Sequence, residues 1–283
     1  MLRVATLNLL HNSDALRERV EHLITELVTE NLDFLLIQEA MPEDAGGYSA
    51  LEHLALALGM RHVIYSLDAE KGSGNAVLSK HPLTPIYGGD GVIFPDRAPA
   101  IAETFVDGRR VIAMSYHGAW GPQATGARLT QLRILDEIAR REFIRGGAHL
   151  NRETRPVIIL GGDFNAVPES EPYRFITGLD QVLGYSTLWL DASGDQGHTS
   201  GEPNALSLDT ARSMAGAGYR PERQPKRRID YLFVFEWAYG QAGEPVGARR
   251  IADTTFTAAD GRELPVSDHF GVMAELWMPE RAS

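Results

Sequence analysis

Cysteine is absent from the 283 residues, and so are long apolar runs and any excess of basic residues. Without cysteine the protein has no disulfide, no thiolate metal site and no cysteine nucleophile. The absence of cysteine is compatible with both reducing and oxidising compartments. No stretch approaches the roughly 20 apolar residues of a membrane span, and Asn8 and His11 interrupt the apolar N-terminus. We expect a cytoplasmic protein, although a mature secreted form would look the same.

The deficit of basic residues bears on the substrate. There are 38 acidic and 27 basic residues, with a net charge of −11, so the overall field repels a polyanion such as duplex DNA. Basic residues do gather in one late segment, and this cluster is either a solvated loop or a rim that attracts a phosphate-bearing substrate. Its members are Arg212, Arg220, Arg223, Lys226, Arg227 and Arg228.

The chain shows no internal repeat, low-complexity block or linker. With 43% hydrophobic residues it can bury one large core, so we expect a single domain over residues 1–283. Two poorly patterned stretches, 145–155 and 194–226, are predicted to be long loops because strand-like segments follow each of them.

The most informative motif lies at residues 156–165. An aliphatic strand ends in Gly161 and Gly162, and Asp163 and Asn165 follow. The glycines would let the backbone turn or approach a ligand closely, and the carboxylate and amide would enter a pocket. The alternative is an Asx-turn, in which both side chains bond only the local backbone.

Four other strand-like segments also carry polar side chains at one end. The first ends at Asn8, the second at Glu39, another at His117, and Asp268 and His269 precede a late one. Taken alone, Asn8, Glu39 and the Asp268-His269 pair are more often structural than functional. The oxygen donors Asn8, Glu39 and Asp268 are nevertheless the ligand type that Mg²⁺ requires, with Mn²⁺ as a substitute.

Taken in order, these motifs resemble the endonuclease/exonuclease/phosphatase superfamily, also called deoxyribonuclease I-like. The matching elements are Asn8, Gln38-Glu39, His117, Gly162-Asp163-Phe164-Asn165, Arg228-Ile229-Asp230-Tyr231 and Ser267-Asp268-His269. The resemblance implies an α/β fold of four layers, α/β/β/α, in which two packed mixed sheets are flanked by helices. It also implies metal-dependent hydrolysis of a phosphoester. It leaves the substrate open, since the superfamily includes nucleases, sphingomyelinases, inositol-phosphate phosphatases and deadenylases.

Phosphoester hydrolysis suggests a role for each residue of the predicted site. Asp163 would orient or deprotonate the attacking water, and Asn165 would hold a phosphoryl oxygen or the nucleophile. Asp230 would raise the pKa of His269, which would then donate to phosphate. Structural roles are the alternatives: Asp230 could instead bond the neighbouring arginines.

The resemblance also suggests that His117 is the second histidine of the family, which contacts phosphate or protonates the leaving group. The carboxylate that would support His117 is left open: Asn75 resembles a polar position that faces the pocket in many bacterial members, and Glu70 is the alternative support. Asn75 is predicted to bind substrate, together with Arg128 on the helix expected over residues 124–143. Thr199 matches a recurrent threonine, although a local turn motif would also explain it.

These observations predict a Mg²⁺-dependent phosphodiesterase, and the acidic charge favours a small or lipid-derived substrate. A nuclease for single-stranded or damaged nucleic acid is the alternative within the enzyme class, because Tyr116 and Trp120 could stack on bases. A catalytically inactive protein that binds a phosphorylated ligand is the alternative outside it. The presence of the complete motif set favours the enzyme, and the sequence leaves the oligomeric state open.

Overall fold

The structure is a computed structural model. It describes residues 1–10, 14–44, 46–68, 72–87, 98–121, 123–215, 225–236 and 239–279, apart from the side chains of 148, 149, 214 and 215. Glu70, Arg220 and Arg223 lie outside this range. None of the helices in the described segments combines the length and apolar character that crossing a bilayer would demand.

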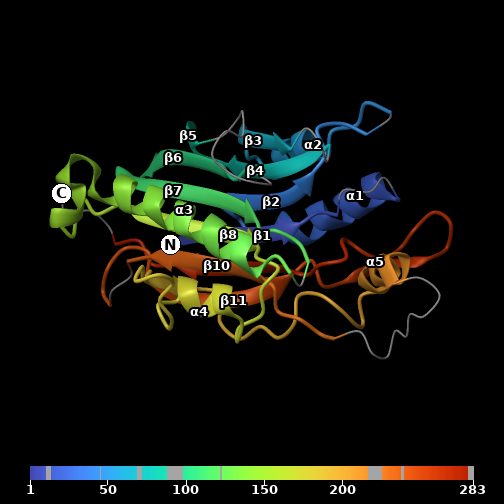
Figure 1. Cartoon of the computed structure of the whole chain (residues 1–283). Helices are drawn as coiled ribbons and strands as arrows, with labels where there is room; N and C mark the ends of the chain where they lie inside the picture. The colour runs from blue at the N-terminus through green and yellow to red at the C-terminus, as the bar shows by residue number, and fades with distance from the viewer. Residues whose placement is uncertain are drawn as a thin grey trace.

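The first large sheet has six strands in the order β11-β14-β1-β2-β4-β3 (Figure 1). Its central strands β1 and β2 are parallel, and its other neighbouring strands are antiparallel. The bounds are β1 Leu2–Asn8, β2 Phe34–Ala40, β3 His62–Asp68, β4 Ser73–Ser79, β11 Pro245–Ile251 and β14 Gly271–Leu276.

The second large sheet repeats this plan, with the order β5-β6-β7-β8-β10-β9 and a parallel central pair, β7 and β8. Its bounds are β5 Thr84–Tyr87, β6 Ala100–Val106, β7 Arg109–His117, β8 Val157–Asp163, β9 Trp189–Asp191 and β10 Asp230–Phe235. A small antiparallel pair, β12 Thr255–Thr257 and β13 Glu263–Pro265, lies apart from both sheets in the hydrogen-bonding pattern.

The first four α-helices along the chain cover the outer faces of the two sheets. Figure 1 shows α3 lying along β7 and β8. Buried residues of α1 and α2 share one apolar cluster with Leu7 and Ile37 of the first sheet, whereas α3 and α4 share another with Ile158 and Leu160 of the second. The bounds are α1 Leu16–Leu27, α2 Ala50–Ala57, α3 Thr125–Ile144, α4 Glu171–Ile176 and α5 Ala205–Ala215, with a 3-10 helix, η1, at Arg145–Leu150.

A third apolar cluster fills the space between the sheets. Alternate residues of the same strands supply it, such as Val4 and Leu36 from the first sheet and Ile159 and Leu232 from the second. Because successive strand residues point to opposite faces, one run of Val, Ile and Leu supplies both an inner and an outer core. The predicted four-layer α/β/β/α sandwich is confirmed.

The two glycines of the 156–165 motif are required by packing rather than by a ligand. A Cβ on Gly161 would lie 2.6 Å from Leu232 and 2.7 Å from Leu36, in the contact between the sheets. A Cβ on Gly162 would lie 1.7 Å from the Tyr116 carbonyl oxygen of the neighbouring strand. We expected these glycines to allow a turn or a close approach to a ligand, and the contacts instead place them against Leu232, Leu36 and the Tyr116 carbonyl.

The loop prediction for 194–226 is wrong in part, because α5 lies within it. Asn204 caps this helix: its Oδ1 accepts a hydrogen bond of 2.9 Å from the backbone N–H of Ser207. Leu206 packs in a small cluster with Leu10 and Leu264. The segment is short, and glycine and proline residues flank it, so its sequence shows no clear helical period. Packing against distant residues therefore stabilises this helix.

Candidate active site

The predicted site residues meet where the central strands of both sheets end. Asn8 and Glu39 lie at the carboxyl ends of the parallel pair β1 and β2, and His117 and Asp163 at those of β7 and β8. Asp230 begins the antiparallel strand β10 directly opposite Asp163. Parallel strands deliver their final side chains to one edge of a sheet, and stacking the sheets brings the two edges together.

A cavity of about 460 Å³ lies at this edge. Six of the predicted site residues line it: Glu39, His117, Asp163, Asn165, Asp268 and His269. Asp230 lies behind His269 and is fully buried. A cavity of this size is within the range of small-molecule sites, and its charged lining suits a polar substrate.

Local backbone geometry directs Glu39 to the site. Strand β2 carries an irregularity between Ile37 and Ala40, and Glu39 has a φ of 55°, in the left-handed region. This conformation is uncommon for a residue other than glycine, and such residues concentrate at functional sites. Asn8 then donates from Nδ2 to Glu39 Oε1 at 3.2 Å and to Asp163 Oδ2 at 3.3 Å.

The amide oxygen of Asn8 accepts a hydrogen bond of 3.0 Å from the backbone N–H of Leu10. In this arrangement the nitrogen of Asn8, rather than its oxygen, faces the carboxylates. Asn8 therefore supports Glu39 and Asp163 by donating hydrogen bonds to their carboxylates. Metal ligation by Asn8 stays a prediction.

Asp163 combines the two roles that the sequence left as alternatives. Its Oδ1 accepts from the backbone N–H of Asn165 at 2.8 Å, which is an Asx-turn, while Oδ2 lies 3.3 Å from His117 Nε2 and 3.8 Å from His269 Nε2. Burial alone would raise the pKa of Asp163, but the two histidines outweigh it and lower the pKa to about 2. This carboxylate is therefore ionised across the physiological range.

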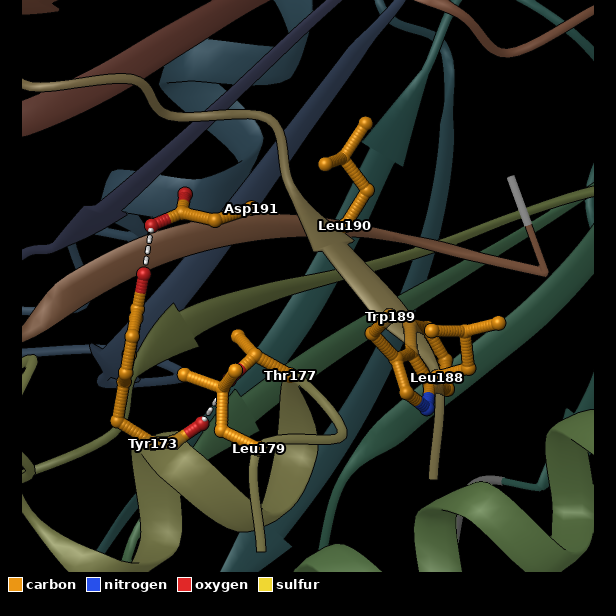
Figure 2. A pocket seen from close by; sticks show the side chains of 7 residues that line it. All are labelled: Tyr173, Thr177, Leu179, Leu188, Trp189, Leu190 and Asp191. Carbon is orange, nitrogen blue, oxygen red and sulfur yellow. Dashed lines mark hydrogen bonds between the residues drawn. The ribbon is translucent and has the colours of Figure 1, made fainter. Parts of the chain in front are cut away.

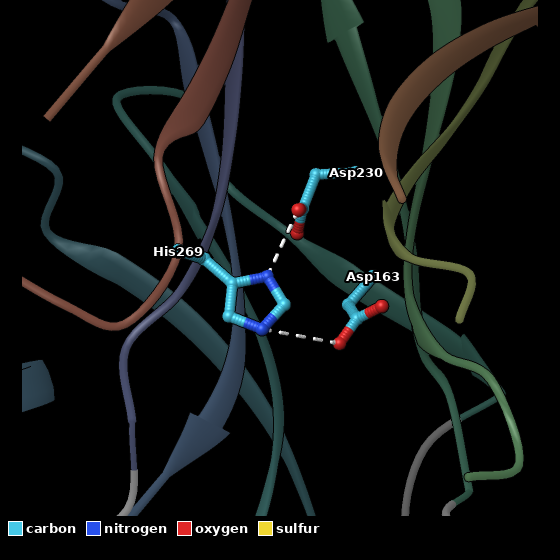
Figure 3. A group of neighbouring side chains, drawn as sticks. All are labelled: Asp163, Asp230 and His269. Atoms are coloured by element: carbon cyan, nitrogen blue, oxygen red, sulfur yellow. Dashed lines mark hydrogen bonds and ion pairs between the residues drawn. The ribbon is translucent and has the colours of Figure 1, made fainter. Parts of the chain in front are cut away.

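His269 lies between two carboxylates, with one ring nitrogen directed at each (Figure 3). Its Nδ1 is 2.9 Å from Asp230 Oδ2. Burial would lower the pKa of His269, but the charges of Asp230 and Asp163 raise it well above its ordinary value. Both carboxylates thus favour the protonated imidazole, and the predicted pairing with Asp230 is present in the structure.

The alternative for Asp230, a bond to the neighbouring arginines, is wrong in the described part of the chain. Arg228 instead donates to Asp191 Oδ2 at 2.7 Å and stacks over the ring of Tyr231. Thr199 is a long-range partner rather than a local turn residue: its Oγ1 accepts from the backbone N–H groups of Ile229 and Asp230 at 3.0 and 3.2 Å. This hydroxyl fixes the start of β10.

His117 shares the carboxylate of Asp163 with His269 and also faces Glu39. Its Nε2 is 3.3 Å from Asp163 Oδ2 and 3.8 Å from Glu39 Oε1. Glu70, the alternative acidic support, lies outside the described residues. Asn165 has a φ of 49° and donates from Nδ2 to the Gly118 carbonyl at 3.1 Å, which leaves its second amide N–H for a ligand in the cavity.

The carboxylates around the cavity form a set suited to a divalent cation. Burial raises the pKa of Asp268, and the nearby negative charges of Glu39 and Asp163 add to the rise against the effect of His269. A cation held by Glu39 and Asp268 would offset this repulsion, and hard oxygen donors favour Mg²⁺ or Mn²⁺. Asp163, Asp230 and His269 also form a buried group whose donor atoms lie within 4.8 Å of one another.

Asn75 and Arg128 do not line the cavity in the described part of the chain. Asn75 is buried and donates to the Ala98 carbonyl at 2.8 Å. Arg128 is buried too, and its Nη1 donates to the carbonyls of Ala119 and Gly121 at 2.8 and 2.9 Å. Arg128 thus braces the loop after His117, and the structure gives neither residue a contact with the space where substrate would bind.

The basic residues that were predicted to form a rim lie in different surroundings. Arg227 is exposed and lines the cavity, whereas Arg212 pairs with Asp209 on α5. Arg228 donates to Asp191 and Tyr173, two residues that line a second, more apolar cavity of about 410 Å³ between α4 and β9. In that cavity Tyr173 donates to Asp191 (Figure 2). Only part of the basic segment therefore faces the predicted site.

Sequence reasoning missed three hydroxyl side chains that line the cavity, Ser200, Ser207 and Thr210. They belong to the segment that was predicted to be a loop, where no periodic pattern marked α5. Isolated serines and threonines carry no signal of their own, so only the placement of the helix reveals them.

A family model establishes the class of protein that this fold and site define. The model of the Endonuclease/Exonuclease/phosphatase family matches residues 5–269. The chain therefore belongs to that family. Its members are metal-dependent phosphoric ester hydrolases, and the protein is an enzyme of this class.

Solved structures with the same fold include proteins of different activities. Humanised TDP2 of D. rerio is 16% identical, with a TM-score of 0.66, and the match covers 98% of this chain and 99% of that one. Beta toxin from Staphylococcus aureus is 15% identical, with a TM-score of 0.65 and coverages of 97% and 99%. Sphingomyelinase C from Streptomyces griseocarneus is 18% identical, with a TM-score of 0.63 and coverages of 96% and 98%. No curated protein sequence matches the chain.

Proposed function

We propose that the protein is a Mg²⁺-dependent phosphodiesterase acting on a small or lipid-derived phosphodiester. The observation that carries the proposal is the single cavity in which Glu39, Asp268, Asp163 and His269 meet. Glu39 and Asp268 would hold the cation, with Asn8 beside them. When bound, a divalent cation would offset the charge of the phosphate and make water more acidic.

The remaining side chains would perform the proton transfers and hold the phosphoryl group. Asp163, which is ionised and lines the cavity, would orient or deprotonate the attacking water. His269, kept cationic by Asp230, would donate from Nε2 to a phosphoryl oxygen, and the free amide N–H of Asn165 would add a second donor. His117, whose Nε2 lies 3.3 Å from the same Asp163 oxygen, would protonate the leaving oxygen.

The cavity entrance supports a substrate of limited charge. Arg227 and Trp120 both line the cavity, and Trp120 is 60% exposed. One arginine can pair with a single phosphodiester, whereas the net charge of −11 works against a long polyanion. Trp120 offers an apolar face to the organic part of the substrate.

Hydrolysis of bis-p-nitrophenyl phosphate tests the proposal. We expect release of p-nitrophenol with Mg²⁺ or Mn²⁺, loss of release with EDTA, and recovery when the cation is restored. Replacing Asp163 by asparagine should abolish most of the release, which separates this enzyme from a contaminating phosphatase. Absence of cation-dependent turnover across a panel of phosphodiesters and phosphomonoesters would favour the catalytically inactive binding protein.

The exposed ring of Trp120 supports a second candidate, a nuclease for single strands. Aromatic side chains at such sites stack on unpaired bases, and a solved structure of D. rerio TDP2, 17% identical, is complexed with a single-strand DNA product. A labelled single-stranded oligonucleotide and a sphingomyelin-type lipid, compared at equal concentration, distinguish the two. The first candidate predicts faster turnover of the lipid, and the second predicts faster cleavage of the oligonucleotide with a large loss in Trp120→Ala.

A further inference from the structure

Helix α5 forms one wall of the cavity and is docked on the segment that carries Asp268. Besides capping the helix, Asn204 donates from Nδ2 to the backbone carbonyl of Ser267 at 2.8 Å. Asn204 is 2% exposed, so the start of α5 is fixed by a buried hydrogen bond to the residue beside Asp268. Ser207 and Thr210 then project from the helix into the cavity lining.

Thr210 makes a direct contact with the proposed metal ligand. Its Oγ1 donates to Asp268 Oδ2 at 3.1 Å. The other hydroxyl near this carboxylate belongs to Ser267, whose Oγ lies 3.3 Å from Asp268 Oδ1 but only 2.6 Å from the Asn8 carbonyl oxygen. A hydroxyl has one hydrogen to donate, and the shorter contact to Asn8 takes it.

Among the described residues, Thr210 is therefore the side-chain hydroxyl that donates to the Asp268 carboxylate. This carboxylate is buried near the like charges of Glu39 and Asp163, and without a donor its orientation would be free to relax away from them. Hydrogen bonds to ligating carboxylates orient them toward the metal, and their removal typically weakens metal binding by about 10- to 100-fold.

We propose that Thr210 is a positioning residue that holds the Asp268 carboxylate in place for a divalent cation. The inference rests on the proposed function, because it assumes that Asp268 binds the cation. It also gives α5 a role beyond forming a wall. Its Asn204 cap fixes the start of the helix beside Ser267, and Thr210, about 1.7 turns further along, reaches the Asp268 carboxylate.

Calorimetric titration of the full chain with Mn²⁺ alone tests the proposal without relying on turnover. Thr210→Val keeps the shape of the side chain and removes the hydroxyl, so we expect the affinity for Mn²⁺ to fall about tenfold or more. Thr210→Ser keeps the hydroxyl and should restore most of the affinity. Thr130→Val on α3 is the matched control, because the Thr130 hydroxyl only bonds the Gly126 carbonyl at an exposed position.

The outcomes separate this inference from the proposed function. Wild-type affinity in Thr210→Val, or equal losses in Thr210→Val and Thr130→Val, would overturn the positioning role while leaving the metal site intact. If the wild-type protein itself binds no Mn²⁺, the proposed metal-dependent function fails and the positioning role fails with it. Thermal unfolding in EDTA confirms that a variant with reduced affinity is folded.

Discussion

Replacing Asp163 by asparagine removes one negative charge from the centre of the cavity with little change of shape. The amide oxygen can still accept the 2.8 Å hydrogen bond from the Asn165 backbone, so the turn is retained. The lost carboxylate faces His117 and Asn8, both at 3.3 Å, and His269 at 3.8 Å. We expect kcat to fall by about 10²- to 10⁴-fold, as for other general bases, which corresponds to about 2.7–5.4 kcal/mol of transition-state stabilisation.

The assay is the initial rate of bis-p-nitrophenyl phosphate hydrolysis at saturating substrate with excess Mg²⁺. Asp136→Asn is the matched control: Asp136 is a fully buried aspartate on α3 that accepts hydrogen bonds from Trp189 at 2.8 Å and Tyr185 at 2.7 Å, away from the cavity. This control should lower the melting temperature and leave kcat unchanged. A kcat of Asp163→Asn equal to that of the wild type would refute the role of Asp163.

Three further predictions concern metal binding, acid stability and packing. Glu39→Gln should weaken Mn²⁺ binding in calorimetry by about tenfold or more, and unchanged affinity would remove Glu39 from the metal site. Burial raises the pKa of Glu142, but hydrogen bonds from Arg110 and its neighbours lower it overall. The resulting stability is therefore complete above the ordinary pKa of 4.5 and is lost as the pH falls through the lower folded value. Glu142→Gln should unfold more easily by about 1–3 kcal/mol at pH 7 and by less at pH 3; a loss independent of pH would contradict this. Gly162→Ala should prevent folding or sharply lower the melting temperature, because its Cβ would overlap the Tyr116 carbonyl; a wild-type melting temperature would show that the strands can separate there.

The sequence predicted the parts of the fold and site that depend on local pattern. Buried strands ending in Asn8, Glu39 and Asp163 were visible because polar residues directly follow aliphatic runs. The four layers were expected only from the family resemblance that these motifs carry. The turn between β6 and β7 is another local pattern: Asp107-Gly108 is an Asp-Gly pair of the kind that favours hairpins, and both residues have positive φ, 49° and 74°.

What escaped prediction depends on contacts between distant segments. Asn204 and Leu206 hold helix α5 against residues distant in the sequence, such as Ser267 and Leu264. The local sequence therefore shows no helical period that would predict it. Arg128 was predicted to bind substrate from its position on a helix. That position does not show that its guanidinium donates to the Ala119 carbonyl. For Thr199 the sequence offered a local bond, whereas its partner is the backbone of Asp230, thirty-one residues away.

Diffraction from crystals grown with Mn²⁺, recorded with the anomalous signal of manganese, tests the central claim most directly. Our account predicts a manganese peak in the cavity, against the carboxylates of Glu39 and Asp268 and beside Asp163 and His269. Two results would contradict the account. In the first, the protein hydrolyses phosphodiesters while its manganese lies elsewhere. In the second, the carboxylates of Glu39 and Asp268 hold no cation at saturating Mn²⁺.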